Sequence, residues 1–128
     1  SIRAKGKPMS AYFIGMTALF GVCGVLARLG IDRGFAMVGA TGFPWATLAI
    51  NLVGSFAAGA FGGTSALSAE WRQAIMIGLL GGFTTFSAFS LQSFRMIQAG
   101  QSAEAIAYLV LSPVLGVALA AAGWKLTS

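Results

Sequence analysis

Charged residues, histidine and cysteine are scarce in this chain of 128 residues. Only 9% of the residues are charged and 57% are hydrophobic, whereas a soluble domain carries about a quarter charged residues. Histidine, the commonest general base and metal ligand, is absent. The single cysteine, Cys23, excludes an internal disulfide and a cysteine-rich metal site. With only three acidic residues besides, the composition indicates a one-domain membrane protein that is not an enzyme.

The net charge of +5 does not indicate nucleic-acid binding, because the basic residues are spread along the chain. Arg3, Lys5 and Lys7 lie in an N-terminal tail, and the others lie near the ends of apolar segments, where cations anchor helices at the membrane surface. We expect residues 1–10 to form a tail, of which Ser1–Pro8 is in part an expression remnant or a trimmed end. No cleavable signal peptide is evident.

Four apolar segments are each long enough to supply the roughly 20 residues that cross a bilayer as a helix. They cover residues 11–29, 45–63, 71–98 and 103–124. An even number of spans places both chain ends on the same side of the membrane. The sequence therefore predicts an all-α, multi-pass membrane protein in which residues 1–128 form a single four-helix domain.

The connections between the spans are predicted to be short. Residues 32–44 form a glycine-rich loop that ends at Pro44, whose fixed φ suits the position before a helix. Ser68 is expected to cap the start of the third span. Gly100 is expected to end that span, and Ser102 and Glu104 are expected to open the fourth.

Basic residues barely bias the orientation of the chain. The side that holds both ends carries Arg3, Lys5, Lys7, Arg72 and Lys125, and the opposite side carries Arg28, Arg33 and Arg95. With the tail included, this distribution favours ends inside the cell; without it, two residues oppose three, and the positive-inside rule has little to act on. A chain without such a bias can insert in both orientations, which permits an antiparallel homodimer.

Small residues recur every four positions on the second span. Two neighbouring rows consist of Gly54, Ala58 and Gly62, and of Ser55, Gly59 and Gly63. Such rows let helix backbones approach closely. Because four short spans enclose little volume, we also expect the chain to form an oligomer.

The third span is interrupted by the sequence Gly81-Gly82-Phe83-Thr84-Thr85. Each glycine costs a helix about 1 kcal/mol relative to alanine, and β-branched threonines are also weak helix formers. Within a bilayer, freed backbone groups must be satisfied by protein, water or an ion. A broken third helix would therefore form an ion site. The alternative is a glycine notch that packs against a neighbour within a continuous helix.

Neutral polar side chains occupy the membrane spans. They lie at four-residue intervals on two segments: Thr47, Asn51 and Ser55 on the second, and Tyr108 and Ser112 on the fourth. Pro113, next to the last of these, removes one backbone donor from its helix. Taken singly, these side chains form interhelical hydrogen bonds worth about 0.6 kcal/mol each. Taken together, they form a track of donors for a dehydrated anion.

Phe86 and Phe89 share one helix face beyond the two threonines. Aromatic residues in a span usually pack or meet lipid, but the positive edge of a phenyl ring can also flank an anion. Arg28 closes the first span, where it either reaches toward the membrane surface or attracts anions at a pore mouth. The acids all fall at span ends, which argues against a proton-coupled cation exporter: Asp32, Glu70 and Glu104.

The stretches GGFTTFSAFS at residues 81–90 and TLAIN at residues 47–51, together with Arg28, resemble the Fluc (CrcB) family of fluoride channels. The resemblance extends from about Tyr12 to Trp124. It implies a dual-topology antiparallel homodimer with two pores that exports fluoride passively across the cell inner membrane. The rival interpretations are a small multidrug or cation transporter and a structural bundle that assembles with a larger membrane complex.

The resemblance also implies roles for individual residues. The backbone carbonyls of Gly81 and Thr84 from both subunits would bind a structural sodium ion (Na+) at the dimer centre. The fluoride pores would be lined by Asn51, Phe86, Phe89, Ser112, Thr47, Tyr108 and Ser87, with Arg28 in the vestibule. Ala88 and Gly116 depart from the family pattern, in which hydroxyl residues often occupy these positions. The implied partners are fluoride, a second copy of the chain and membrane lipid, but no nucleic acid.

Overall fold

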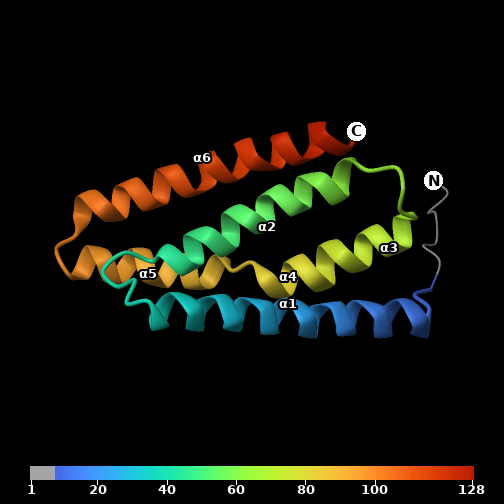
Figure 1. Cartoon of the computed structure of the whole chain (residues 1–128), viewed down its shortest axis with the longest axis horizontal. Helices are drawn as coiled ribbons and strands as arrows, with labels where there is room; N and C mark the ends of the chain where they lie inside the picture. Colours follow the sequence, from blue (N-terminus) through green and yellow to red (C-terminus); the bar gives the residue numbers. More distant parts are fainter. Residues whose placement is uncertain (1–7) are drawn as a thin grey trace, which may run out of the picture.

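An elongated bundle of four helical spans makes up the computed structural model, which describes residues 8–128 (Figure 1). The elements are α1 (Ala11–Met37), α2 (Trp45–Gly63), α3 (Ala69–Ala74), the π-helix η1 (Ile75–Leu80), α4 (Gly81–Phe83), α5 (Phe86–Gln98) and α6 (Ser102–Thr127). The third span runs through α3, η1, α4 and α5. In the described part of the chain, four spans are long and apolar enough to cross a membrane. This confirms the predicted all-α, multi-pass membrane protein.

The start of α1 and the end of α6 lie at the same end of the bundle (Figure 1). The connection at residues 38–44 and the turn at residues 99–101 lie at the opposite end, which we call the loop end. This arrangement agrees with an even number of spans. Most of the predicted tail, including Arg3, Lys5 and Lys7, lies outside the described residues.

Helix α1 is longer than predicted, because residues 32–37 continue the helix instead of starting a loop. The prediction ended the helix where the apolar run ends. Charged residues do not terminate a helix, however, since their side chains can be solvated at the membrane surface. The helix ends only where Gly39 adopts a positive φ of 70°, a conformation that favours glycine. The prediction for Pro44 is confirmed, because it directly precedes α2.

The predicted helix caps have mixed outcomes. The Ser68 hydroxyl accepts a hydrogen bond from the Trp71 amide at 3.3 Å, which confirms the cap of the third span. Gly100 follows α5 with a φ of 80°, as its role as a helix stop requires. The fourth span opens as predicted, because α6 begins at Ser102 with Glu104 in its first turn, although Gln101 takes the cap position without a side-chain bond.

Helices α2 and α6 form the most extensive contact of the bundle. A Cβ atom added to Gly59 would overlap the Ala120 carbonyl, and one added to Gly123 would overlap the Phe56 carbonyl. The two backbones therefore meet without intervening side chains, as the row of small residues predicts. Helix α1 packs in the same way on the third span, where Gly24 faces the Leu79 carbonyl.

Candidate functional site

Two residues of the third span, Thr84 and Thr85, have extended backbone angles between α4 and α5. Their φ and ψ values are −84° and 158° for Thr84 and −149° and 114° for Thr85. The amide and the hydroxyl of Thr84 both donate to the Leu80 carbonyl, at 2.9 and 2.8 Å. The Thr85 hydroxyl accepts from the Ala88 amide at 3.2 Å and caps α5. The chain thus leaves one helix and enters the next with most of its end groups satisfied.

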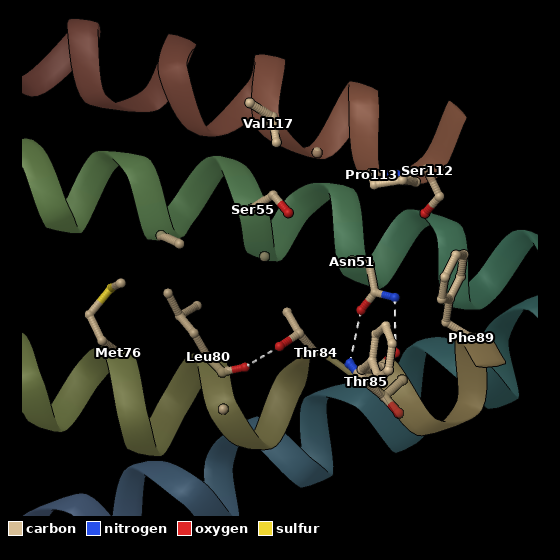
Figure 2. Close-up of a pocket in the computed structure, with 15 residues that line it drawn as sticks. Asn51, Ser55, Met76, Leu80, Thr84, Thr85, Phe89, Ser112, Pro113 and Val117 are labelled. Carbon is tan, nitrogen blue, oxygen red and sulfur yellow. Dashed lines mark hydrogen bonds between the residues drawn. The ribbon is translucent and has the colours of Figure 1, made fainter. Parts of the chain in front are cut away.

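Asn51 on α2 holds this extended segment through two hydrogen bonds (Figure 2). Its Oδ1 accepts from the Thr85 amide at 2.9 Å, and its Nδ2 donates to the Thr85 carbonyl at 3.1 Å. In a continuous α-helix the Thr85 amide would donate to the Gly81 carbonyl. Because Asn51 takes that amide, the Gly81 carbonyl loses its regular helical donor.

A hollow of about 510 Å³ opens beside this segment, between α2, α6 and the third span (Figure 2). We call it the central hollow. Six of the residues proposed from the sequence lie on its wall: Asn51, Gly81, Thr84, Phe86, Phe89 and Ser112. The structure therefore gathers residues that are up to 61 positions apart in the chain, as counted from Asn51 to Ser112.

Thr47 and Tyr108 do not line the central hollow but meet next to it through Gln92. The Gln92 amide nitrogen donates to the Thr47 hydroxyl at 2.8 Å, and the Tyr108 hydroxyl donates to the Gln92 amide oxygen at 3.1 Å. Thr47 and Tyr108 are only 4% and 1% exposed. The Tyr108 ring lies 4.8 Å from the ring of Phe89, between centroids, which connects this triad to the hollow.

Gln92 was missed by the sequence analysis. The available signal was its amide within an apolar span, three residues after Phe89 and hence on a neighbouring part of the same face. A buried amide needs hydrogen-bond partners, and Gln92 finds them in Thr47 of the second span and Tyr108 of the fourth. Because the three residues are far apart in the sequence, their hydrogen bonds could not be predicted from it.

Ser55 supplies a hydroxyl where α6 has none. Its Oγ lies 3.2 Å from the position that a Cβ atom on Gly116 would occupy, and both residues line the central hollow. The Ser55 hydroxyl on α2 therefore lies close to the place where a hydroxyl side chain at position 116 would begin. At Ala88, the backbone amide donates to the Thr85 hydroxyl at 3.2 Å.

Arg28 and Ser87 lie away from the central hollow. Arg28 is partly buried on α1, and the helix continues beyond it to Met37. Ser87 is exposed, with its hydroxyl 3.4 Å from that of Thr85. Phe86 is 80% exposed although it lies on the hollow wall, with its ring centroid 6.0 Å from that of Phe89.

This arrangement can bind ions but offers no acid or base for catalysis on its walls. Backbone carbonyls are cation ligands, whereas hydroxyl, amide and aromatic C–H groups present positive partial charge to anions. Among the described residues, no cluster of three or more histidine, cysteine or acidic side chains could hold a metal ion. The neutral oxygens at the extended segment are those of the main chain and of the Asn51, Thr84 and Thr85 side chains.

Comparison with known proteins gives the family of the chain. The profile of the family described as CrcB-like protein, Camphor Resistance (CrcB), matches residues 15–124. The chain is 42% identical over 115 residues to "Fluoride-specific ion channel FluC 1" of Nitrobacter hamburgensis, covering 87% of this chain and 91% of the relative. It is 39% identical over 129 residues to "Fluoride-specific ion channel FluC" of Renibacterium salmoninarum, covering 94% and 100%. The chain therefore belongs to the CrcB family.

Proposed function

We propose that the protein is a fluoride-selective ion channel that lets fluoride leave the cytoplasm passively, and that it is not an enzyme. The names of its relatives support this function. So does the central hollow, whose polar atoms come from amide, hydroxyl and backbone groups and from no carboxylate. Such groups can replace the water around a small anion without repelling it.

The observation that carries the proposal is the pair of hydrogen bonds between Asn51 and Thr85. They hold the chain extended in the middle of a span, where an interruption must be stabilised by specific partners. A packing notch would need no such clamp. The clamp therefore supports a site that is built for ions rather than for helix packing alone.

We further propose that two copies of the chain form an antiparallel homodimer with two pores. Phe86 is 80% exposed in the single chain although it borders the central hollow. A second copy would cover this ring and close the hollow into a pore. The near balance of basic residues between the two ends of the bundle is compatible with insertion in both orientations.

A structural sodium ion at the dimer centre fits the residues present. The Gly81 carbonyl has lost its regular helical donor to Asn51, and the Thr84 carbonyl belongs to an extended residue. Two copies would present these carbonyls in pairs, and carbonyl oxygens suit a monovalent cation without a carboxylate. When bound, the ion would neutralise these dipoles and hold the two copies together.

In this channel, Asn51, Phe86, Phe89 and Ser112 would line the fluoride path, and the triad of Thr47, Gln92 and Tyr108 would continue it. Ser87 would add a hydroxyl near the partner's side of the pore, and Arg28 would attract anions to a vestibule. The proposed location is the cell inner membrane, with membrane lipid around the dimer.

Fluoride release from proteoliposomes tests the function. A potassium ionophore is added to vesicles loaded with fluoride or chloride, so that potassium efflux prevents a membrane potential from opposing anion release. Anion-selective electrodes record the release. We expect rapid release of fluoride and none of chloride above that of empty vesicles. Equal release of both anions, or no release from protein that elutes as a folded dimer, would overturn the proposal.

The dimer and the sodium ion need separate tests. In a Cys23→Ser background, single cysteines placed at opposite ends of the bundle should crosslink between copies if the dimer is antiparallel, whereas two cysteines at the same end should not. Removing sodium by exchange into a salt of a large organic cation should weaken dimerisation. Crosslinking only between like ends would contradict the antiparallel arrangement.

A further inference from the structure

A second hollow of about 480 Å³ lies at the loop end, between the connection that precedes α2 and the last turn of α5. Its wall includes Thr41, Phe43, Gln92, Arg95, Met96 and Gln101. We call it the Arg95 hollow. It differs from the central hollow in carrying a side chain with a full positive charge.

Helix α5 connects the two hollows. Phe89 lies on the wall of the central hollow, and Gln92, one turn later, lies on the wall of the Arg95 hollow. Arg95 follows after one more turn, so the three side chains are spaced over about 9 Å of helix rise. The boundary between the hollows is the triad in which Gln92 bonds to Thr47 and Tyr108.

Aromatic contacts strengthen this boundary. The ring of Phe43, on the wall of the Arg95 hollow, lies 5.4 Å from the ring of Tyr108. The ring of Tyr108 also lies 4.8 Å from that of Phe89, between centroids. Tyr108 thus contacts one aromatic ring from the wall of each hollow and donates its hydroxyl to Gln92.

Arg95 lies in the last turn of α5, where its charge suits the helix C-terminus, but its guanidinium forms no hydrogen bond with residues 8–128. It is exposed, and it forms no ion pair with any residue from 8 to 128. The last carbonyls of α5 already have backbone donors: Ala99 N to Arg95 O at 2.9 Å, Gln101 N to Met96 O at 2.9 Å, and Gly100 N to Ile97 O at 3.1 Å. The guanidinium is therefore available to something that enters the hollow.

Other charged residues near this end do not line the Arg95 hollow. They are Arg28, Asp32, Arg33 and Glu104. A local positive charge at the opening of a low-dielectric cavity raises the concentration of anions there. The neighbouring amides of Gln92 and Gln101 add neutral donors within the same wall.

We propose that the Arg95 hollow is the loop-end mouth of the anion path, where Arg95 concentrates small monovalent anions and Gln92 passes them to the hydroxyls of Thr47 and Tyr108. This inference rests on the proposed channel function. In an antiparallel dimer, the two copies would present one such mouth on each side of the membrane. The sequence alone gives Arg95 only the role of an interfacial anchor.

Changing the charge at position 95 on a fixed backbone tests the proposal. The variant Arg95→Cys is made in the Cys23→Ser background and reconstituted, and fluoride release is measured at low fluoride concentration. We expect release to fall by roughly tenfold, at the lower end of the range that electrostatic focusing produces. A positively charged methanethiosulfonate reagent should restore release, and a negatively charged one of similar size should lower it further.

Two further measurements isolate the electrostatic effect. Arg95→Lys should keep nearly full release, because it retains the charge. Adding about 1 M of a salt with a large impermeant anion should abolish the difference between the variants, since the screening length then shrinks to about 3 Å. Arg33→Cys, an exposed arginine at the same end but off the hollow wall, is the matched control and should respond to neither reagent.

The outcomes separate this proposal from the channel function. If the unmodified protein releases no fluoride, the channel function fails. If it releases fluoride but Arg95→Cys responds equally to both reagents, or no more than Arg33→Cys, the mouth assignment is wrong. Elution of Arg95→Cys as the normal dimer establishes that the comparison concerns charge and not folding.

Discussion

Helices α2 and α6 pack along each other through glycine and alanine, whereas the third span changes repeatedly from one helical geometry to another between Ala69 and Gln98. In the α2–α6 pair, backbone meets backbone at Gly59 and Gly123. At the third span, directional hydrogen bonds are made by the side chains of Asn51, which reaches over from α2, and of Gln92 on α5. The first region is held by shape and the second by polar contacts.

This difference separates the scaffold from the site. Apolar contact between small residues tolerates no added volume but needs no particular chemistry. The hydrogen bonds of the third span need specific donors and acceptors, because an unpaired polar group in the membrane is costly. Substitutions in the α2–α6 contact should therefore destabilise the protein by added volume, whereas substitutions at the third span should do so by removing hydrogen bonds.

Gly59→Leu should have the largest effect on folding. Its side chain would collide with the Ala120 carbonyl, a backbone group that cannot move without separating α2 from α6. We expect the free energy of unfolding to fall by at least ~3 kcal/mol, at the upper end of overpacking effects. The temperature of aggregation in detergent and the elution volume in gel filtration report this destabilisation. Gly15→Leu is the control, because no neighbouring atom lies within 4 Å of an added Cβ, and an equal effect there would contradict the interpretation.

Asn51→Ala should destabilise the protein less than Gly59→Leu does but should reduce fluoride release more directly. It leaves the amide and carbonyl of Thr85 without partners, and because Thr85 is only half-buried we expect the free energy of unfolding to fall by ~1–3 kcal/mol in total. Fluoride release should fall sharply because the extended segment loses its clamp. Melting temperature and fluoride release are measured on the same preparation.

Ser55→Ala is the matched control for Asn51→Ala. Ser55 lies one turn further along α2 on the same hollow, and its hydroxyl makes no hydrogen bond to residues 8–128. We expect the free energy of unfolding to change by no more than about 0.5 kcal/mol, as for substitutions that break no hydrogen bond and leave no cavity in a packed core. If both variants lose stability equally, the clamp does not stabilise the site.

The sequence predicted the scaffold better than the site for a physical reason. Span lengths and small-residue rows follow from hydropathy and four-residue periodicity, and the bounds 45–63 of the second span agree with α2. The end of α1 was wrong because composition marks the membrane surface and not the end of the hydrogen-bond ladder. Residues 32–37 remain helical outside the apolar run.

The π-helical geometry of residues 75–80 had no sequence signal. Its residues, IMIGLL, would suit an α-helix equally well, so the local sequence does not distinguish the two hydrogen-bond patterns. The segment packs closely on α1, where a Cβ atom added to Gly78 would overlap the Thr17 carbonyl. Gln92 was overlooked for a related reason, because its importance comes from two partners on other helices. Local patterns predict which residues are polar, but only the packed bundle decides which of them meet.

Gln92→Leu should have an intermediate effect. It removes both hydrogen bonds of the triad and leaves the buried hydroxyls of Thr47 and Tyr108 without this partner, at a net cost of ~1–2 kcal/mol. Gln92→Glu keeps both contacts if the Thr47 hydroxyl turns from acceptor to donor, so its melting temperature should stay closer to that of the unmodified protein. Equal destabilisation by Leu and Glu would show that shape, and not hydrogen bonding, holds the triad.

Phe86→Ile should have the smallest effect on the fold of the single chain and therefore gives the sharpest separation of the two regions. The ring is 80% exposed, so its replacement removes little buried area, and we expect a stability change within about 0.5 kcal/mol. Fluoride release should nevertheless fall severalfold, because the aromatic edge on the hollow wall is lost. Val114→Ala, 59% exposed and off that wall, should change neither quantity. If Phe86→Ile releases fluoride as fast as the unmodified protein, its ring faces lipid, and the aromatic part of the proposed pore is wrong.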